Sequence, residues 1–282
     1  PADYFLPRPH TLAIREYVPG NLIYANGQKF VPRLFHLEAE EQPVSIYVGL
    51  ANEAVIDAER GAEVPGGADV RTLRVVRMCD VDLPHQWHIQ DEEDHRFQMA
   101  VVVFGHELGR HGGGMAWRWG AQDVLLRRNV HIRLVNIGVR TLVQSATPQL
   151  GYPLCLVTGQ SRSPLASQTE MDNFRNDHRE RYGREPEHVG FYCNVVTDAL
   201  SFPDLANTGV AYSVVESLRL AASEVLEMEV EDLQVLCVPH LDRPTVDAIL
   251  FDPMPGGSGL LEQMVARWPE IMAQACLLYT SP

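Results

Sequence analysis

The sequence predicts an α+β fold, in which an N-terminal, mainly antiparallel β domain is followed by a compact α/β domain of helix, strand, strand and helix. Two observations predict it. Short β-branched runs separated by turn residues fill residues 12–145, and a clear helical periodicity with an apolar stripe begins at residue 208. We therefore expect a β-rich domain over residues 1–149, a loop-rich segment over 150–205 and the α/β domain over 206–275.

The N-terminal segment is expected to form strands joined by tight turns. Asn26-Gly27 is the strongest short hairpin signal, and Val18–Asn21 is a second turn signal. The acidic run Asp91–Asp94 is expected to be a solvated loop. The expected strands are Leu12–Tyr17, Leu22–Ala25, Val44–Leu50, Leu73–Met78, Gln98–Phe104 and His131–Ile137.

Helix signals dominate the second half of the chain. The polar segment Glu170–Tyr182 is helical in pattern, and Gly183 is a normal helix stop. Asn207 and Thr208 can cap a helix that runs to about residue 228. The expected elements after it are strands Leu233–Val238 and Val246–Phe251, a turn at Asp252–Gly259 and a helix from about Ser258, with Pro269 breaking that helix or starting a new turn.

Both ends of the chain are unusual. The first residue is Pro1 and not methionine, and residues 276–282 differ in character from the amphipathic pattern that stops near Ala275. This last segment is similar to translated sequencing-adaptor readthrough, so we exclude it from the prediction of the fold. We expect the chain to be a piece of a larger protein.

Composition limits the classes of function. The 282 residues are 45% hydrophobic, which is too apolar for a disordered chain, and no run approaches the roughly 20 apolar residues of a membrane-spanning helix. No secretory leader is evident, so we expect a cytoplasmic protein. The net charge of −14 excludes a chain that coats nucleic acid over its whole surface. Its five cysteines are odd in number and far apart, which is not a disulfide framework.

Two common catalytic motifs are excluded. A nucleotide-binding P-loop needs a lysine after glycine and before serine or threonine, whereas the sole lysine is Lys29, between Gln28 and Phe30. The segment from His106 to His111 has one residue too many for a zinc protease, because histidines five residues apart lie about 140° apart on a helix. We expect a loop there, and no catalytic residues are predicted in the chain.

A structural metal site is a weaker candidate. Cys155-Leu-Val-Thr-Gly159 has the outline of a zinc knuckle with Thr158 in place of its second cysteine, and His178 and Cys193 follow at plausible distances. Three ligands do not close a tetrahedral structural site. Either His188 completes the site with zinc, or the site has lost its metal and packing replaces it, or the cysteines are simply buried.

Two features could bind phosphate. Asp252-Pro-Met-Pro-Gly-Gly-Ser-Gly259 joins a strand to a helix, and its Gly256, Gly257, Ser258 and Gly259 could bring backbone N–H groups and a helix end to an anion, with Asp252 beside them. The alternative is a tight connection that only needs glycine conformations.

The second feature is a basic island over residues 101–150, which hold six arginines and two acids. Its Arg127 and Arg128 lie near tryptophans, as in single-strand binding sites, although a solvated strand face would have the same composition.

The segment Phe251–Leu261 resembles the hallmark of the MrfA-like Zn-binding domain, in which a strand ends in an acidic residue and Pro-Gly-Gly-(Ala/Ser)-Gly leads into a helix. Residues 208–228 and 235–251 fit the layout of that domain, and Ala13–Gly20 and Tyr24–Phe30 resemble the stretch after the helicase core in such proteins. The family lies at the C-terminus of DEAD/DEAH-type helicases, including DrmB-like phage-defence proteins and DNA-repair helicases.

The resemblance implies an ATP-dependent parent that acts on DNA rather than RNA, with zinc as a candidate cofactor and protein partners in a repair or defence complex. The chain departs from the family in two ways. The cysteine cluster that normally follows the last helix is missing, and the helicase core, where ATP would bind, is expected ahead of Pro1.

Three functions remain open. The chain could be an accessory region that guides nucleic acid or supports the motor, or a protein-interaction module without nucleic-acid contact, which its acidic flanks favour. A stand-alone enzyme would need a pocket of convergent titratable groups, and the sequence predicts none.

Overall fold

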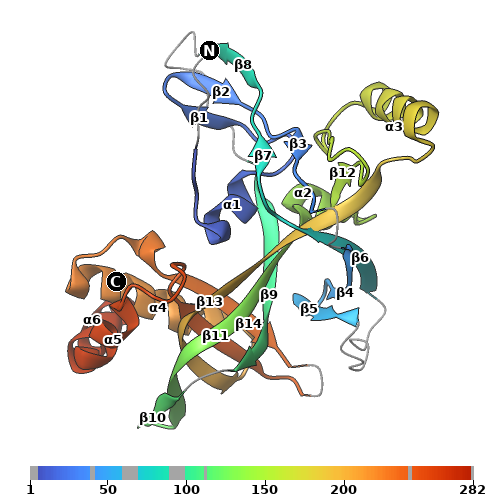
Figure 1. Cartoon of the computed structure of the whole chain (residues 1–282). Helices are drawn as coiled ribbons and strands as arrows, with labels where there is room; N and C mark the ends of the chain where they lie inside the picture. Colours follow the sequence, from blue (N-terminus) through green and yellow to red (C-terminus); the bar gives the residue numbers. More distant parts are fainter. Residues whose placement is uncertain are drawn as a thin grey trace.

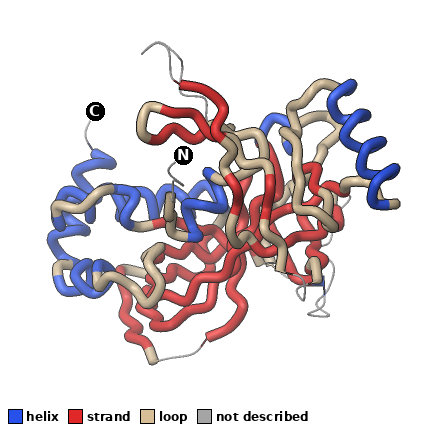
Figure 2. Tube along the Cα trace, turned by 45° about the horizontal axis from the view of Figure 1, so that its top comes forward, coloured by secondary structure: helices blue, strands red, loops and turns tan. Residues whose placement is uncertain are grey.

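The computed structural model describes residues 6–38, 42–58, 69–88, 99–110, 113–240 and 243–280, and for residues 85–88, 110, 279 and 280 it describes the backbone alone. The α+β prediction is confirmed, with a large mixed sheet, two small sheets and helices at both ends of the large sheet (Figures 1 and 2). Three helices lie together at one end, α4 (Thr208–Leu226), α5 (Leu260–Ala266) and α6 (Trp268–Thr280), and α3 (Gln168–Tyr182) lies at the other.

Two long antiparallel strands, β11 (Gln122–Val139) and β13 (Glu187–Leu205), form the centre of the large sheet. Each has different partners along its length. The partners of β11 are β10 (Gly114–Trp119) and then β9 (Val101–Arg110). The partners of β13 are β12 (Tyr152–Leu154), β6 (Val70–Arg77) and finally β15 (Val246–Phe251), which also pairs with β14 (Gln234–Pro239).

The sheet continues from β6 through β4 (Val44–Gly49) to β5 (Ala54–Asp57), and the β6–β13 pair is parallel while the other pairs are antiparallel. The large sheet thus draws strands from all three predicted segments. The small sheets are β1 (Ile23–Ala25) with β2 (Gln28–Phe30) and β8 (His85–His88), and β3 (Leu34–Phe35) with β7 (Val81–Asp82). The Asn26-Gly27 hairpin is confirmed, because Ala25 pairs with Gln28 across it.

Apolar side chains at the two ends of β13 pack in separate parts of the core. Leu200 and Phe202 of β13 are fully buried beneath α4, whose Ala211, Val215 and Leu218 face them. Further along, Phe191 packs on Phe35 with ring centroids 4.8 Å apart. Core clusters cover both faces of β13, with Phe191 and Cys193 in one cluster and Leu200 and Phe202 in another. This explains why β13 lacks a simple alternation of apolar and polar residues.

The helix signals after residue 165 are confirmed. A capping box starts α3 at Ser167, and Gly183 ends it with φ 66°. The side chain of Asn207 accepts a hydrogen bond of 2.9 Å from Val210 N at the start of α4. Pro269 stands at the second residue of α6, where it starts a new helix after α5.

Three predictions are wrong. Leu12–Tyr17 is not a strand, since α1 (His10–Glu16) begins directly after Pro9 and buries Ala13 and Ile14. Residues 187–205 belong to β13 and not to a loop-rich segment. The loop expected from His106 to His111 is also wrong, because residues 106–110 belong to β9 (Val101–Arg110). The tail, which is excluded from the prediction, is helical to Thr280, its last buried residue among those with described side chains is Ala275, and Leu277 is 57% exposed. The predicted loop Asp91–Asp94 lies outside the described residues.

The remaining short elements are α2 (Arg140–Val143) after β11 and the 3-10 helix η2 (Val230–Asp232) after α4. In the described parts of the chain, no helix has the length and apolar character needed to cross a membrane.

Candidate functional site

An open cleft of about 370 Å³ lies where β9 passes the hairpin of β14 and β15. Residues 106–109 of β9 form one wall, and Val238, Asp247 and Ile249 form the other. These strands approach closely but do not pair, and a Cβ atom on Gly105 would lie 2.9 Å from Leu236 Cδ1. The backbone of β9 can therefore lie against β14 at this glycine, and the cleft opens beyond it.

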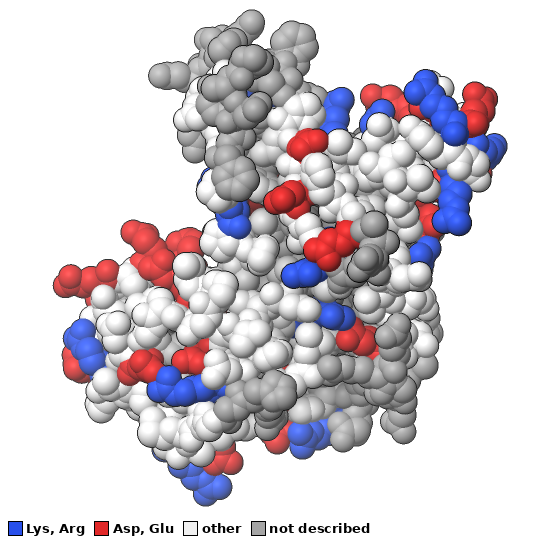
Figure 3. Space-filling view, viewed as in Figure 1, with Lys and Arg blue, Asp and Glu red and all other residues white. Residues whose placement is uncertain are grey.

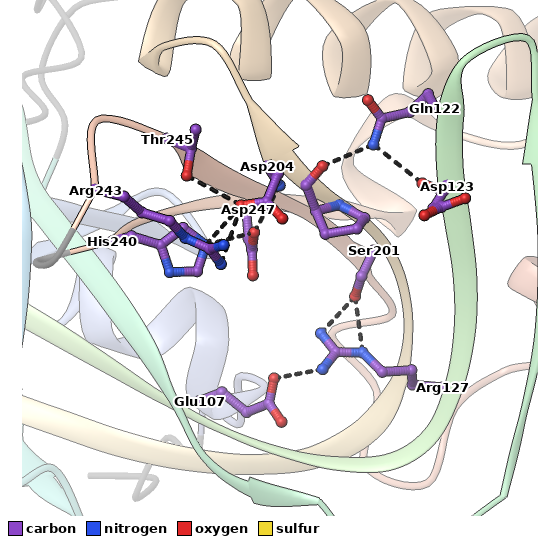
Figure 4. Close-up of polar contacts among 11 residues, drawn as sticks. Glu107, Gln122, Asp123, Arg127, Ser201, Asp204, His240, Arg243, Thr245 and Asp247 are labelled. Carbon is purple, nitrogen blue, oxygen red and sulfur yellow. Dashed lines mark hydrogen bonds and ion pairs between the residues drawn. The ribbon is translucent and has the colours of Figure 1, made fainter.

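Arg127 from the basic island lies beside this cleft and is engaged by protein groups (Figure 4). Its Nη1 lies 2.7 Å from a carboxylate oxygen of Glu107, and its Nε donates to Ser201 Oγ at 3.0 Å. The Arg127 side chain is 13% exposed. Because Glu107 neutralises the guanidinium in a mostly buried position, Arg127 fixes β9 and β13 to β11 and offers little free charge to a phosphate.

A second polar group on the far wall joins Asp204, His240 and Asp247 (Figure 4). His240 Nε2 lies 2.8 Å from Asp247 Oδ1 and 3.8 Å from Asp204 Oδ1. Carboxylate and imidazole ligands in this number can hold a divalent cation. Arg243 opposes that use, because its guanidinium lies 3.0 Å from Asp204 Oδ1 and 3.2 Å from His240 Nε2.

These three residues follow no sequence motif and are not among the predicted site residues. Asp204 lies near the end of β13, His240 follows β14 and Asp247 lies on β15, so only the folded sheet brings them together. The signal available from sequence was limited to polar residues at the ends of neighbouring strands.

His106, which lines the cleft, belongs to a nearly buried ionic cluster with Asp57 and Arg133. Asp57 accepts two hydrogen bonds of 3.1 Å from Arg133 Nη1, and His106 Nε2 lies 3.4 Å from its Oδ1. Burial by itself raises the pKa of Asp57, but the hydrogen bonds and charges of His106 and Arg133 outweigh burial and lower that pKa below its ordinary value. The guanidinium of Arg133 also stacks over the Tyr192 ring at 4.4 Å.

We expect the Asp57→Asn variant to lose about 2 kcal/mol of unfolding free energy at pH 7. The lowered pKa makes the Asp57 carboxylate stabilising above its unfolded pKa of about 3.9, and this contribution disappears as the pH falls through the folded pKa. Urea unfolding at several pH values should therefore show a gap between wild type and variant that narrows in acid. A gap that is constant from pH 7 to pH 3 would contradict the assignment.

The turn Asp252–Gly259 is confirmed as a strand-to-helix connection between β15 and α5. Asp252 is 1% exposed and accepts hydrogen bonds from Met254 N at 2.9 Å and from both the backbone and the hydroxyl of Ser258. Gly256 N donates to Val196 O at 2.9 Å. The N–H groups of Gly256 and Ser258, which the anion hypothesis needs, are thus used within the protein, and the buried Asp252 carboxylate already accepts from this turn.

The structure does bring Arg128 to this turn. Its Nη1 lies 3.3 Å from Asp198 Oδ2 and also contacts Glu262 of α5, while a Cβ atom on Gly257 would lie 3.7 Å from the same Asp198 carboxylate. Gly256, Gly257 and Gly259 have φ of 82°, 80° and 86°, which favours glycine at each position. Arg128 therefore ties β11 to the turn and to α5 through two acids.

The three predicted metal ligands lie in separate surroundings. Cys155 opens a tight turn after β12, in which Gly159 N donates to Cys155 O and Thr158 Oγ1 accepts from Gln160 N. Cys193 Sγ contacts His10 O, and burial raises the pKa of its thiol to about 12. His178 Nδ1 lies 2.9 Å from Phe174 O.

Within the described residues, the group that brings three candidate ligand atoms within 4.8 Å of one another is Asp204, His240 and Asp247. The geometry therefore gives no support to zinc at Cys155, His178 and Cys193. His188, the candidate fourth zinc ligand, lies 2.6 Å from the Gln149 amide nitrogen. His111, the second histidine of the rejected zinc-protease spacing, lies outside the described residues.

Four of the six arginines of the basic island pair with acids of the same chain. Besides Arg127 and Arg128, Arg118 pairs with Asp123 at 3.0 Å and Arg133 pairs with Asp57. On the face of the molecule that Figure 3 draws, basic and acidic side chains lie interspersed. The stacking part of the hypothesis also weakens, because Trp117 packs edge-on against Trp268 at 5.3 Å, although Trp119 is 39% exposed.

The sequence matches no protein-family profile and no curated protein. Solved structures similar to this chain include a crystal structure of DUF1998 helicase MrfA bound to DNA, with a TM-score of 0.38 and 11% identity. A structure of the same helicase bound to DNA and AMPPNP has a TM-score of 0.29 and 12% identity.

Each similarity covers 97% of this chain but 27% and 25% of the two helicase chains, so this chain spans about a quarter of their length. At these TM-scores the similarity assigns neither a fold nor an activity.

Proposed function

We propose that this chain is an accessory region of an ATP-dependent, helicase-like protein of DNA repair or phage defence, and that it supports the motor and guides DNA beside it without hydrolysing ATP. The observation that carries the proposal is the unit of β15, the Asp252–Gly259 turn and α5, whose sequence resembles the MrfA-like domain. The buried Asp252 carboxylate ties both ends of the turn together, which suits a rigid joint between a strand and a helix.

The arginine pairs favour a supporting role over an open track for phosphates. Arg127 and Arg128 each join β11 to neighbouring elements through carboxylates, so their charges are neutralised by acids of the same chain. The sole lysine, Lys29, lies in β2 and outside any glycine-rich phosphate loop, so nucleotide hydrolysis would come from another part of the parent protein. The proposal includes no zinc, because the three predicted ligands lie apart.

A protein-interaction module without DNA contact is the second candidate. It is favoured by exposed acids that cluster at the end of α4 and in the segment after it, where Figure 3 shows red side chains together at the upper left. These exposed acids are Glu224, Glu227, Glu229, Glu231 and Asp232. The apolar side chains of Val210 and Leu220 on α4 are 41% and 44% exposed, so this end of the molecule offers both charge and apolar area to a partner.

Photo-crosslinking distinguishes the two candidates. The purified chain, alone and within its parent protein, is irradiated with a single-stranded oligonucleotide that carries photoreactive thymidine analogues, and the modified peptides are mapped by mass spectrometry. The accessory-region proposal predicts DNA-linked peptides from this chain, whose yield falls as salt is added. Crosslinks to protein partners alone, with none to DNA in either sample, would select the interaction module.

A further inference from the structure

A second cavity, of about 250 Å³, lies on a part of the molecule that the cleft does not use. It is formed where α1, β9, α2 and α4 meet. Two arginines line it, Arg15 from α1 and Arg140 from the start of α2, together with the amide of Gln144 and the phenol of Tyr212. Residues 101–104 of β9 form one wall of the cavity.

The guanidinium of Arg15 is the unusual group. Burial lowers its pKa, and the groups that act against burial are Tyr212 and Cys193. Both are neutral at physiological pH, because burial raises the pKa of each to about 12. Arginine keeps its proton in proteins, so Arg15 is a partly desolvated cation without a carboxylate among its electrostatic partners.

The other polar groups of the cavity also lack a protein partner. Across the described residues, no hydrogen bond or ion pair engages the side chains of Arg15, Arg140, Gln144 or Tyr212. Arg15 is half-buried, so its partial desolvation has no counter-charge to offset it, whereas Arg140, Gln144 and Tyr212 are exposed and can reach a ligand from solvent. This cavity therefore combines two forked cations, an amide and a protonated phenol, all of which can donate hydrogen bonds to one ligand.

We propose that this cavity is a binding site for a phosphoryl group. Guanidinium forks match phosphate oxygens in pairs, and a tetrahedral oxyanion can accept from four donors that come from different elements. The apolar β9 wall leaves room for the group to which the phosphate is attached. The site does not depend on the proposed function, because its chemistry is the same for free phosphate, a nucleotide and the backbone of a nucleic acid.

One lining residue carries a negative charge that should weaken phosphate binding. Glu53 also faces the cavity, on an exposed turn before β5, and its carboxylate opposes an anion there. We therefore expect Glu53→Gln to tighten phosphate binding and Arg140→Gln to weaken it about tenfold or more, because a charge-assisted hydrogen bond is lost. Arg140 is exposed, so its replacement should leave the fold intact even if Arg15→Gln does not.

The test is calorimetric titration of the chain with inorganic phosphate at pH 7.5, against sodium chloride of equal ionic strength. Saturable binding that weakens in Arg140→Gln, strengthens in Glu53→Gln and is unchanged in Arg118→Gln supports the site. Arg118 is the matched control, because it is an exposed arginine paired with Asp123 on β10. Absence of binding to phosphate, a nucleoside monophosphate and an oligonucleotide alike, or equal affinity in wild type and Arg140→Gln, would overturn the proposal.

Parallel titrations with phosphate, a nucleoside monophosphate and an oligonucleotide identify the molecule that carries the phosphoryl group. Binding of the mononucleotide that is tighter than binding of phosphate assigns a free nucleotide, and an effect of Arg140→Gln on the oligonucleotide assigns the nucleic-acid backbone. If binding of the oligonucleotide, of phosphate and of the mononucleotide is in each case unaffected by Arg15→Gln, Arg140→Gln and Glu53→Gln, this site is overturned and the proposed function still stands.

Discussion

Replacing Asp252 with alanine is expected to lower the free energy of unfolding by about 3–5 kcal/mol. The carboxylate is 1% exposed and accepts from Met254 N and from the N–H and hydroxyl of Ser258. Alanine would leave these donors buried without an acceptor, in a turn whose glycines have left-handed backbone angles and depend on those bonds. Urea unfolding, with the transition midpoint and slope both fitted, measures the loss.

Two variants calibrate this effect. Ser258→Ala removes one of the three donors and should cost about 1–2 kcal/mol. Asp123→Ala removes an acid of similar size whose side chain is 57% exposed and pairs with Arg118, and it should cost less than about 1 kcal/mol. If Asp252→Ala were no more harmful than Asp123→Ala, the turn would not be held by its carboxylate, and an anion site there would become the better account.

Replacing Gly159 with alanine is expected to cost at least about 3 kcal/mol. Gly159 has φ 72°, and a Cβ atom there would lie 1.9 Å from the carbonyl oxygen of Phe35. Phe35 cannot easily move, because its N–H donates to Gly159 O at 2.8 Å and its ring packs on Phe191 in the core. The glycine that gives residues 155–159 the outline of a zinc knuckle is thus required by contact with β3.

Gly183→Ala provides the matched control for backbone strain. Gly183 has φ 66°, close to the value at Gly159, but no atom lies within 4 Å of its would-be Cβ. Its replacement should therefore cost only the left-handed conformation, about 1–2 kcal/mol. Thermal and urea unfolding of the two variants separate strain from collision, and equal losses would show that the contact with Phe35 is relieved cheaply.

Local signals in this sequence were predicted well because the chemistry that produces them is local. Asn207 caps α4, Gly183 ends α3 and Asn26-Gly27 turns the first hairpin, each through contacts within a few residues. The strand-to-helix turn at Asp252–Gly259 belongs to the same class. Its internal hydrogen bonds could not be told from an anion site by sequence, because both use glycines and a helix start.

Long-range features were missed for the same physical reason. β13 lacks the alternation of a half-buried strand because different core clusters cover its two faces, and its partners change from β6 and β12 to β15. The group of Asp204, His240 and Asp247 exists only because β13, β14 and β15 are neighbours in the sheet. Arg127 and Arg128 are adjacent in sequence, yet the fold gives them different acids and different roles.

If this chain contacts DNA as part of a larger helicase-like protein, its affinity for DNA must depend on salt. Fluorescence anisotropy of a labelled single-stranded oligonucleotide is measured with the purified chain, and with its parent protein, from low to physiological salt. We predict that the logarithm of the affinity falls linearly with the logarithm of salt concentration, with a slope of about −0.7 for each phosphate contacted. Binding that is absent at low salt in both samples, or insensitive to salt, would contradict the account.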